Sequence, residues 1–359
     1  MNYLSFSRNF GKEAAIYAGL KETCGEYVAL IDADLQQRRV FRPHHDNSFR
    51  CLAEDNRGGV WGGTLFEGLV RISPNHLDFR HYSEKFIGGS FKARDFVEDN
   101  DGCIWIGSDT KGLLCLDPGD DNDVCSRKYF ANRNITGLMA EGSDLWVGTI
   151  DNELPVARLD ARTGKVTYYP NAGKSAYAFA RDNSGRLWIG GKDGFAVGRD
   201  RPDGSFEKDI FVPTAQVCRI ICASDNSVWV ACISGRIFCY SESSFTTYNI
   251  PVSNIMTDIA EDGRGRILAT TEGSGLWEFC REEALFKPLA GSEMHLQKIA
   301  MQQDADLLWV TGTKGIQVMN IHHNSPLPHI SRECLNIDRF NYSSNFIDSR
   351  GVLYAGTSD

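Results

Sequence analysis

One short motif recurs along this chain at a nearly fixed interval, and this repetition constrains the fold more than any other feature. The motif places an aromatic residue between apolar neighbours and follows it with Gly-Thr or a close variant, as in residues 103–108 (CIWIGS) and 186–191 (RLWIGG). Successive copies lie 39 to 45 residues apart. A period of about 42 residues is typical of β-propeller blades. The central positions of the eight copies are Trp61, Trp105, Trp146, Trp188, Trp229, Leu268, Trp309 and Tyr354.

The flanks of the motif repeat as well and predict four short strands in each unit. An apolar run that ends in acidic residues precedes the motif, as in residues 95–99 (DFVED) and 178–182 (AFARD). A glycine that opens a further apolar run follows it, as in residues 111–117 (KGLLCLD), and several units add a fourth, aromatic run. The segments rich in Asp, Asn and Gly between the runs have the chemistry of tight hairpin turns.

This pattern predicts an all-β protein: a β-propeller over residues 51–359 with about seven four-stranded blades, and with six or eight blades as the alternatives. We expect the last blade to be incomplete, because residues 352–357 (VLYAGT) are not followed by a glycine-led strand. If the second to eighth copies form the ring, the first copy is surplus to it. The repeated aromatic residues are expected to be structural and buried between neighbouring blades, since stacking covers both faces of each sheet. Trp277 lies in a glycine-led strand, outside this register.

Net charge and the length of the apolar runs restrict the kinds of partner that the chain is expected to bind. The net charge of −9 and the absence of a basic stripe argue against nucleic acid as the main partner. No apolar run approaches the 18–20 residues or so that cross a bilayer, and the first fifteen residues lack the apolar core of a signal peptide. We therefore expect no membrane segment in this chain and find no export signal in it.

Cysteine and histidine are plentiful enough to raise the question of a metal site. The chain has 11 cysteines, most of them in or beside predicted strands, where they are expected to be buried thiols. Cys218 and Cys222 have no second pair at zinc-site spacing. His44-His45-Asp46 and His322-His323 lie in proline-containing connectors and are expected to be solvated. We expect no cofactor.

The N-terminal segment, residues 1–38, has a different pattern and is expected to be a short αβ appendage, joined by a linker at residues 39–50. Residues 5–36 combine a helix candidate with the buried strand YVALIDAD. The segment resembles family 2 glycosyltransferases of the polyprenyl-phosphate sugar transferase type around SRNFGKEA and DADLQ. In that family an Asp-x-Asp motif, matched here by Asp32 and Asp34, helps to hold the nucleotide sugar and its metal. Residues 5–36 are too few to build a nucleotide-sugar domain, so we expect no catalysis from them.

The repeated unit, D-x-x-G-x-[LIV]-W-[IV]-G-T followed by Gly-[LI], resembles the two-component regulator propeller repeat over about residues 50–359. That repeat occurs in the periplasmic sensor region of hybrid two-component systems of gut Bacteroidetes. The resemblance implies a sensor fragment that binds an oligosaccharide, signals through a homodimer in the full protein and is not an enzyme. The alternative is an enzyme, either a propeller lyase or hydrolase or a glycosyltransferase remnant. An enzyme should gather His, Asp or Glu with perturbed pKa values on the axial face, whereas a sensor should present aromatic and neutral hydrogen-bonding groups. Sequence alone identifies no ligand-binding residue in the propeller.

Overall fold

The computed structural model divides into two compact units, Met1–His81 and Tyr82–Asp359. Within the first unit it describes β1 (Phe49–Glu54), β2 (Val60–Thr64) and β3 (Leu69–Ile72), which form one antiparallel sheet. The first motif copy lies on β2, so the range 51–359 expected for the propeller includes a sheet of the first unit. Asp32, Asp34, the histidine pairs and the expected N-terminal appendage lie outside the described residues. The structure describes residues 49–54, 60–64, 69–72, 92–117, 127–251, 255–289, 296–302, 307–312, 315–320, 325–326, 330–331, 340–350 and 352–357.

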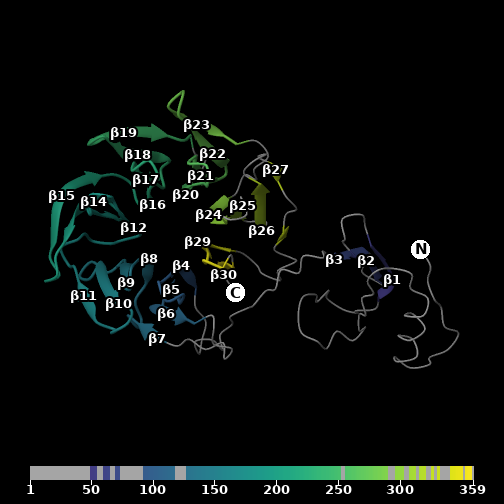
Figure 1. Ribbon diagram of the computed structural model, residues 1–359, viewed down its shortest axis with the longest axis horizontal. Helices are drawn as coiled ribbons and strands as arrows, with labels where there is room; N and C mark the ends of the chain where they lie inside the picture. The colour runs from purple at the N-terminus through teal and green to yellow at the C-terminus, as the bar shows by residue number, and fades with distance from the viewer. Residues whose placement is uncertain are drawn as a thin grey trace. The chain divides into compact units, whose positions relative to one another are not determined.

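The second unit is a β-propeller, which confirms the predicted fold class. Within the described residues it has six antiparallel sheets of four or five strands and one two-stranded sheet, arranged around a common axis (Figure 1). The first three blades are β4 (Ala93–Glu98), β5 (Ile104–Ser108), β6 (Leu113–Leu116) and β7 (Arg127–Tyr129); β8 (Ile135–Glu141), β9 (Asp144–Thr149), β10 (Val156–Asp160) and β11 (Val166–Tyr168); and β12 (Ala178–Arg181), β13 (Leu187–Gly190), β14 (Gly194–Asp200) and β15 (Phe206–Pro213).

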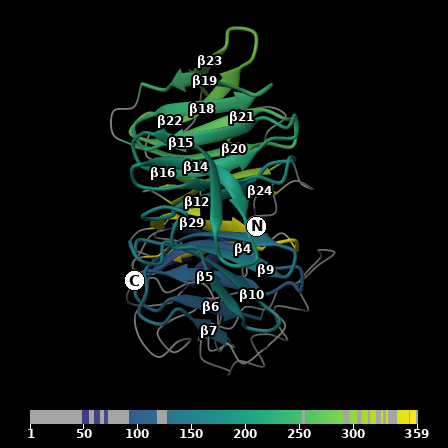
Figure 2. The same cartoon turned by 90° about the vertical axis from the view of Figure 1, so that its left-hand side faces the viewer.

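The remaining sheets follow the same order from the axis outward, and Figure 2 shows the blades from the edge of the ring. They are β16 (Val217–Cys222), β17 (Val228–Cys232), β18 (Arg236–Ser241) and β19 (Ser244–Asn249); β20 (Ile255–Glu261), β21 (Ile267–Glu272), β22 (Gly275–Cys280) and β23 (Leu285–Pro288); β24 (Leu296–Gln302), β25 (Leu307–Gly312), β26 (Gly315–Asn320), β27 (Ser325–Pro326) and β28 (Ile330–Ser331); and the pair β29 (Phe340–Ile347) and β30 (Leu353–Thr357).

The innermost strands close the ring. Each of them contacts the innermost strand of the next sheet, in the order β4, β8, β12, β16, β20, β24 and β29, and β29 in turn contacts β4. The hairpin β29–β30 therefore holds the seventh place in the ring beside six complete blades. The second to eighth motif copies supply these seven places, one copy to each.

The central aromatic residues lie inside the blades. Trp105, Trp146, Trp188 and Trp229 are fully or almost fully buried, and Leu268 is buried in the equivalent place of the fifth blade. Trp309 and Tyr354 are half-buried. Each buried tryptophan packs among residues of its own and a neighbouring sheet, as Trp188 does between Phe195 of β14 and Tyr240 of β18. The structure does not describe the side chain of Trp61.

In several blades the acidic residue before the motif both shapes the hairpin and anchors the aromatic ring. Asp182 Oδ1 accepts the backbone N–H groups of Ser184 and Arg186 at 3.0 and 2.9 Å, and its Oδ2 accepts the indole Nε1–H of Trp188 at 2.8 Å. Asp99 holds Trp105 in the same way, at 2.7 Å. The turn also needs a residue with positive φ, supplied by Gly185 at 77°. A buried indole N–H needs a partner, so the spacing Asp-x5-Trp is a structural unit of the repeat.

The glycine of the motif allows neighbouring blades to approach closely. A Cβ added at Gly190 would lie 2.5 Å from Val217 Cγ1 on the next innermost strand, and one at Gly148 would lie 2.4 Å from the carbonyl oxygen of Ala176. Side chains cannot occupy these points, which explains why Gly follows the W-[IV] pair at both positions. No helix long and apolar enough to cross a membrane occurs in the described part of the chain.

Candidate ligand-binding cavity

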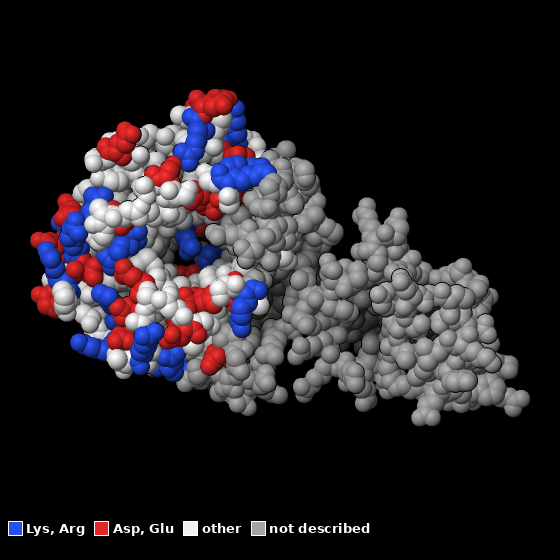
Figure 3. Space-filling view, in the orientation of Figure 1, with Lys and Arg blue, Asp and Glu red and all other residues white. Residues whose placement is uncertain are grey.

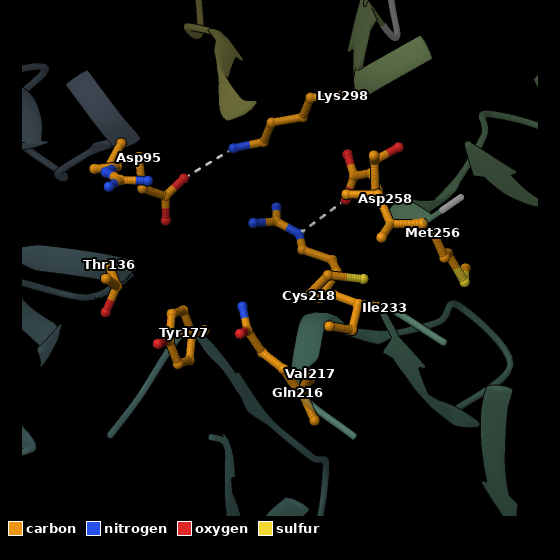
Figure 4. Close-up of a pocket in the computed structure, with 14 residues that line it drawn as sticks. Asp95, Thr136, Tyr177, Gln216, Val217, Cys218, Ile233, Met256, Asp258 and Lys298 are labelled. Carbon is orange, nitrogen blue, oxygen red and sulfur yellow. Dashed lines mark hydrogen bonds and ion pairs between the residues drawn. The ribbon is translucent and has the colours of Figure 1, made fainter. Parts of the chain in front are cut away.

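A cavity of about 240 Å³ lies where the innermost strands meet at the axis of the ring. The space-filling view shows it as a hollow in this face of the propeller (Figure 3). Five of the seven innermost strands contribute to it, together with Tyr177 before β12, Gln216 before β16 and Ile233 after β17. Its lining residues are Arg94, Asp95, Thr136, Tyr177, Gln216, Val217, Cys218, Arg219, Ile233, Ile255, Met256, Thr257, Asp258 and Lys298 (Figure 4).

A repeated β-bulge places side chains in this cavity. The register between the innermost strand and its neighbour slips by one residue near the start of β4, β8, β16 and β20. The extra residues are Arg94, Thr136, Cys218 and Thr257, and all four line the cavity. Bulges bend a strand and change the direction of a side chain, and they are common beside functional sites. The repeat therefore presents one non-apolar group from each of these blades to the axis.

The most deeply buried charged pair of the cavity joins the sixth blade to the first. Lys298 Nζ lies 2.8 Å from Asp95 Oδ1, and both side chains are almost completely buried. The other carboxylate oxygen, Asp95 Oδ2, accepts the backbone N–H of Leu138 on the second blade at 2.9 Å. Asp95 thus has a partner for each oxygen, and the pair bridges across the position of the two-stranded seventh sheet.

Asp258 is held in a similar way on the fifth blade. Its Oδ1 accepts the backbone N–H of Ile259 and its Oδ2 that of Ile299, each at 3.0 Å. Burial raises the pKa of the Asp258 carboxyl, while the charges of Arg219 and Lys298 and the two N–H groups oppose that rise. Arg219 Nε is 3.8 Å from Oδ1, too far for a hydrogen bond. Since both oxygens are occupied by backbone donors, this carboxylate serves the packing of neighbouring blades.

Other groups of the cavity remain available to a ligand. Arg94 is exposed and makes no hydrogen bond or ion pair with any residue that the structure describes, and Arg219 is about 40% exposed. Tyr177 and Gln216 are half-buried, and Figure 4 shows both lining the cavity. Burial raises the pKa of the Tyr177 phenol, although the nearby charge of Arg94 opposes that rise, so the hydroxyl stays protonated at neutral pH and can donate.

The residues singled out by the sequence lie elsewhere. None of the described motif residues lines the cavity, because each central aromatic residue sits on the second strand of its blade, one strand away from the axis. The sequence marked the cavity residues less clearly than the motif residues. Aligned on the motif, the innermost runs RDFVE, TGLMA, CRIIC and TDIAE each begin with two residues that break the apolar pattern. The first residue of each of these pairs is the bulge residue.

The cysteines are free thiols wherever the structure describes them: Cys103, Cys115, Cys218, Cys222, Cys232, Cys239 and Cys280. Burial raises the pKa of the Cys239 thiol to about 11 and that of Cys218 well above its usual value. These two thiols are therefore protonated at neutral pH. The thiolate is the nucleophile and the metal ligand, so a protonated thiol is poor in both roles. No group of His, Cys, Asp or Glu with the geometry of a metal site occurs among the described residues.

Comparison with solved structures agrees with the fold. The RRP9 WD40 repeats match with a TM-score of 0.60 at 10% identity, covering 76% of this chain and 89% of theirs. The virginiamycin B lyase from Staphylococcus aureus matches with a TM-score of 0.57 at 15% identity, covering 75% of this chain and 95% of the lyase. At such identities the likeness shows the propeller fold alone. The extracellular domain of a hybrid two component system from B. thetaiotaomicron also matches, at 17% identity and a TM-score of 0.49, covering 87% of this chain and 44% of that domain.

Comparison with curated sequences finds short matches in the N-terminal region. The bactoprenol glucosyl transferase of Shigella phage SfX is 64% identical over 33 residues, which are 9% of this chain and 11% of the transferase. A protein named as a glycosyltransferase in Bacillus subtilis (strain 168) is 42% identical over 64 residues, 16% of this chain and 20% of that protein. The chain thus spans a fifth or less of the curated relatives it matches. No model of a known protein family matches the chain.

Proposed function

We propose that this propeller is the ligand-binding part of a sensor and that its central cavity binds a fragment of an oligosaccharide without converting it. One observation carries the proposal: the buried carboxylates of the cavity are occupied, whereas its neutral donors and guanidinium groups are accessible. Each oxygen of Asp95 and Asp258 already has a protein partner, so both carboxylates are held in structural contacts between blades. Tyr177, Gln216 and Arg94 remain available to bind hydroxyl groups.

The size and polarity of the cavity suit such a ligand. A volume of about 240 Å³ accommodates one or two sugar rings, with water-mediated contacts at the opening. The resemblance of the repeat to two-component regulator propellers adds the expectation of an oligosaccharide ligand, a periplasmic location and a homodimer in the full sensor. Two of the similar structures are lyases, of streptogramin B and virginiamycin B, and they keep a propeller lyase as the second candidate.

The test is a binding screen on the purified chain, followed by a search for product. Mono-, di- and trisaccharides are added and the melting temperature is recorded, because a ligand that binds only the folded state raises it. Hits are titrated calorimetrically against the wild type and a Tyr177→Phe Gln216→Ala double variant, and then incubated overnight and examined by mass spectrometry. We expect binding that weakens in the double variant, and an unchanged ligand mass. Conversion of the ligand, or binding unaffected by the double variant, would overturn the proposal.

A further inference from the structure

The charge balance of the central cavity differs from that of the whole protein. The lining includes three cationic side chains, Arg94, Arg219 and Lys298, and two anionic ones, Asp95 and Asp258. The formal sum, 3 − 2, is +1, within a chain whose net charge is −9. The Lys298–Asp95 pair is closed at 2.8 Å and Asp258 faces Arg219 at 3.8 Å, so the unmatched positive charge belongs to Arg94.

Arg94 has the position and the chemistry of an anion anchor. As the extra residue of the bulge in β4, it lies on the axial side of the strand, next to the buried Asp95. It is exposed and forms no hydrogen bond or ion pair within the part of the chain that the structure describes. The planar guanidinium group offers two parallel N–H donors that match a carboxylate.

Tyr177 supplies a second donor to the same cavity. The innermost strand β12 begins directly after Tyr177, whose backbone N–H donates to the carbonyl oxygen of Gly190 at 2.7 Å and so fixes the residue at the rim of the third blade. Its side chain and that of Arg94 line the same cavity from the third and first blades. A phenolic O–H and a guanidinium group together can satisfy both oxygens of one carboxylate.

We propose that the ligand of the central cavity is an acidic saccharide and that Arg94, assisted by Tyr177, binds its carboxylate. This inference rests on the proposed sensor function and adds the class of ligand to it. A neutral sugar would leave the guanidinium group unmatched, whereas a uronic acid residue brings the charge of the cavity to zero. Arg219 lies on the fourth blade and contributes to the positive potential from there.

The test uses matched pairs of ligands and matched variants. The full chain is titrated with disaccharides of galacturonate, glucuronate and mannuronate, with the carboxyl-reduced form of each, and with a sulfated neutral disaccharide. The variants are Arg94→Gln, Arg94→Lys and, as the control, Arg199→Gln, which removes an exposed arginine of β14 outside the cavity. Thermal melting without ligand checks that each variant folds.

We expect a uronate to bind, Arg94→Gln to weaken that binding about 10- to 100-fold, and Arg199→Gln to leave it unchanged; a hydrogen bond to a charged group contributes this much. Arg94→Lys should recover only part of the loss, because it keeps the charge but not the paired donors. Equal binding of the acidic and reduced forms, or no effect of Arg94→Gln, would overturn the inference and leave the sensor proposal standing. Preference for the sulfated ligand would replace carboxylate by sulfate and overturn the inference as stated. Binding of none of these saccharides would overturn both.

Discussion

The buried pair of Lys298 and Asp95 offers a sharp test of how the ring is held together. The two side chains are 6% and 8% exposed, respectively, and their charged atoms lie 2.8 Å apart. Lys298→Met keeps most of the volume of the side chain and removes its charge. The carboxylate of Asp95 then stays buried with the N–H of Leu138 as its remaining described partner. Removing one partner of a buried pair costs about 3–5 kcal/mol in unfolding free energy, since the other charge loses its compensation.

A matched control separates burial from the charge contact itself. Arg281 and Asp225 also lie 2.8 Å apart, but their side chains are 55% and 37% exposed. Solvent screens such a pair, so Arg281→Met should cost less than about 1 kcal/mol. Urea unfolding followed by tryptophan fluorescence measures both variants, with the slope of the transition compared to detect a change of the denatured state.

A second variant keeps the test informative if Lys298→Met barely folds. Asp95→Asn combined with Lys298→Met removes both charges, and the amide oxygen can still accept the N–H of Leu138. We expect this double variant to be more stable than Lys298→Met alone. The reasoning is refuted if Lys298→Met lowers the unfolding free energy no more than Arg281→Met does. It is also refuted if the double variant loses as much unfolding free energy as Lys298→Met and Asp95→Asn lose when each is made alone.

Four further predictions concern the repeat and the N-terminal segment. Trp188→Ala should lower the unfolding free energy by about 3–5 kcal/mol in the same urea assay. Burial would raise the pKa of Asp182, but the hydrogen bonds from Ser184 and Trp188 and the backbone N–H and charge of Arg186 outweigh burial and hold the pKa below its usual value. The ionised carboxylate therefore stabilises the fold above about pH 4, and this stabilisation is lost as the pH falls through the folded-state pKa. Asp182→Asn should accordingly make the stability less dependent on pH in the acid range. Gly148→Ala should cost about 1–3 kcal/mol because its Cβ would meet a carbonyl oxygen at 2.4 Å, whereas Gly173→Ala, whose Cβ would meet its nearest atom at 3.6 Å, should be neutral. Finally, the chain should not turn over sugar nucleotides with magnesium or manganese; activity that disappears in Asp34→Ala would contradict this.

The repeat predicted the blades because strand packing in a propeller is a local and periodic requirement. In most of the complete blades the run before the motif, the motif and the glycine-led run became the first three strands, as β4, β5 and β6 illustrate. The eight copies fitted either a ring of eight or a ring of seven with a surplus first copy, and the contacts of the innermost strands show seven places. The acidic residues fitted a purely local turn, and only the structure shows that Asp182 also accepts the indole N–H of Trp188.

The cavity could not be predicted in the same way, because it is built from departures from the repeat. A ring brings equivalent positions of different blades to one axis, so the chemistry of the axis depends on which residue each blade places at its bulge. Sequence gives no register for a one-residue bulge, and without that register Arg94 is only an exposed arginine beside an aspartate. We expect ligand selectivity to depend on positions that differ between blades, because residues that recur at every blade hold the ring together. Arg94, Thr136, Cys218 and Thr257 occupy one such position with three kinds of side chain. Exchanging Arg94 for the threonine of the second blade should therefore change what the cavity binds while leaving the propeller folded.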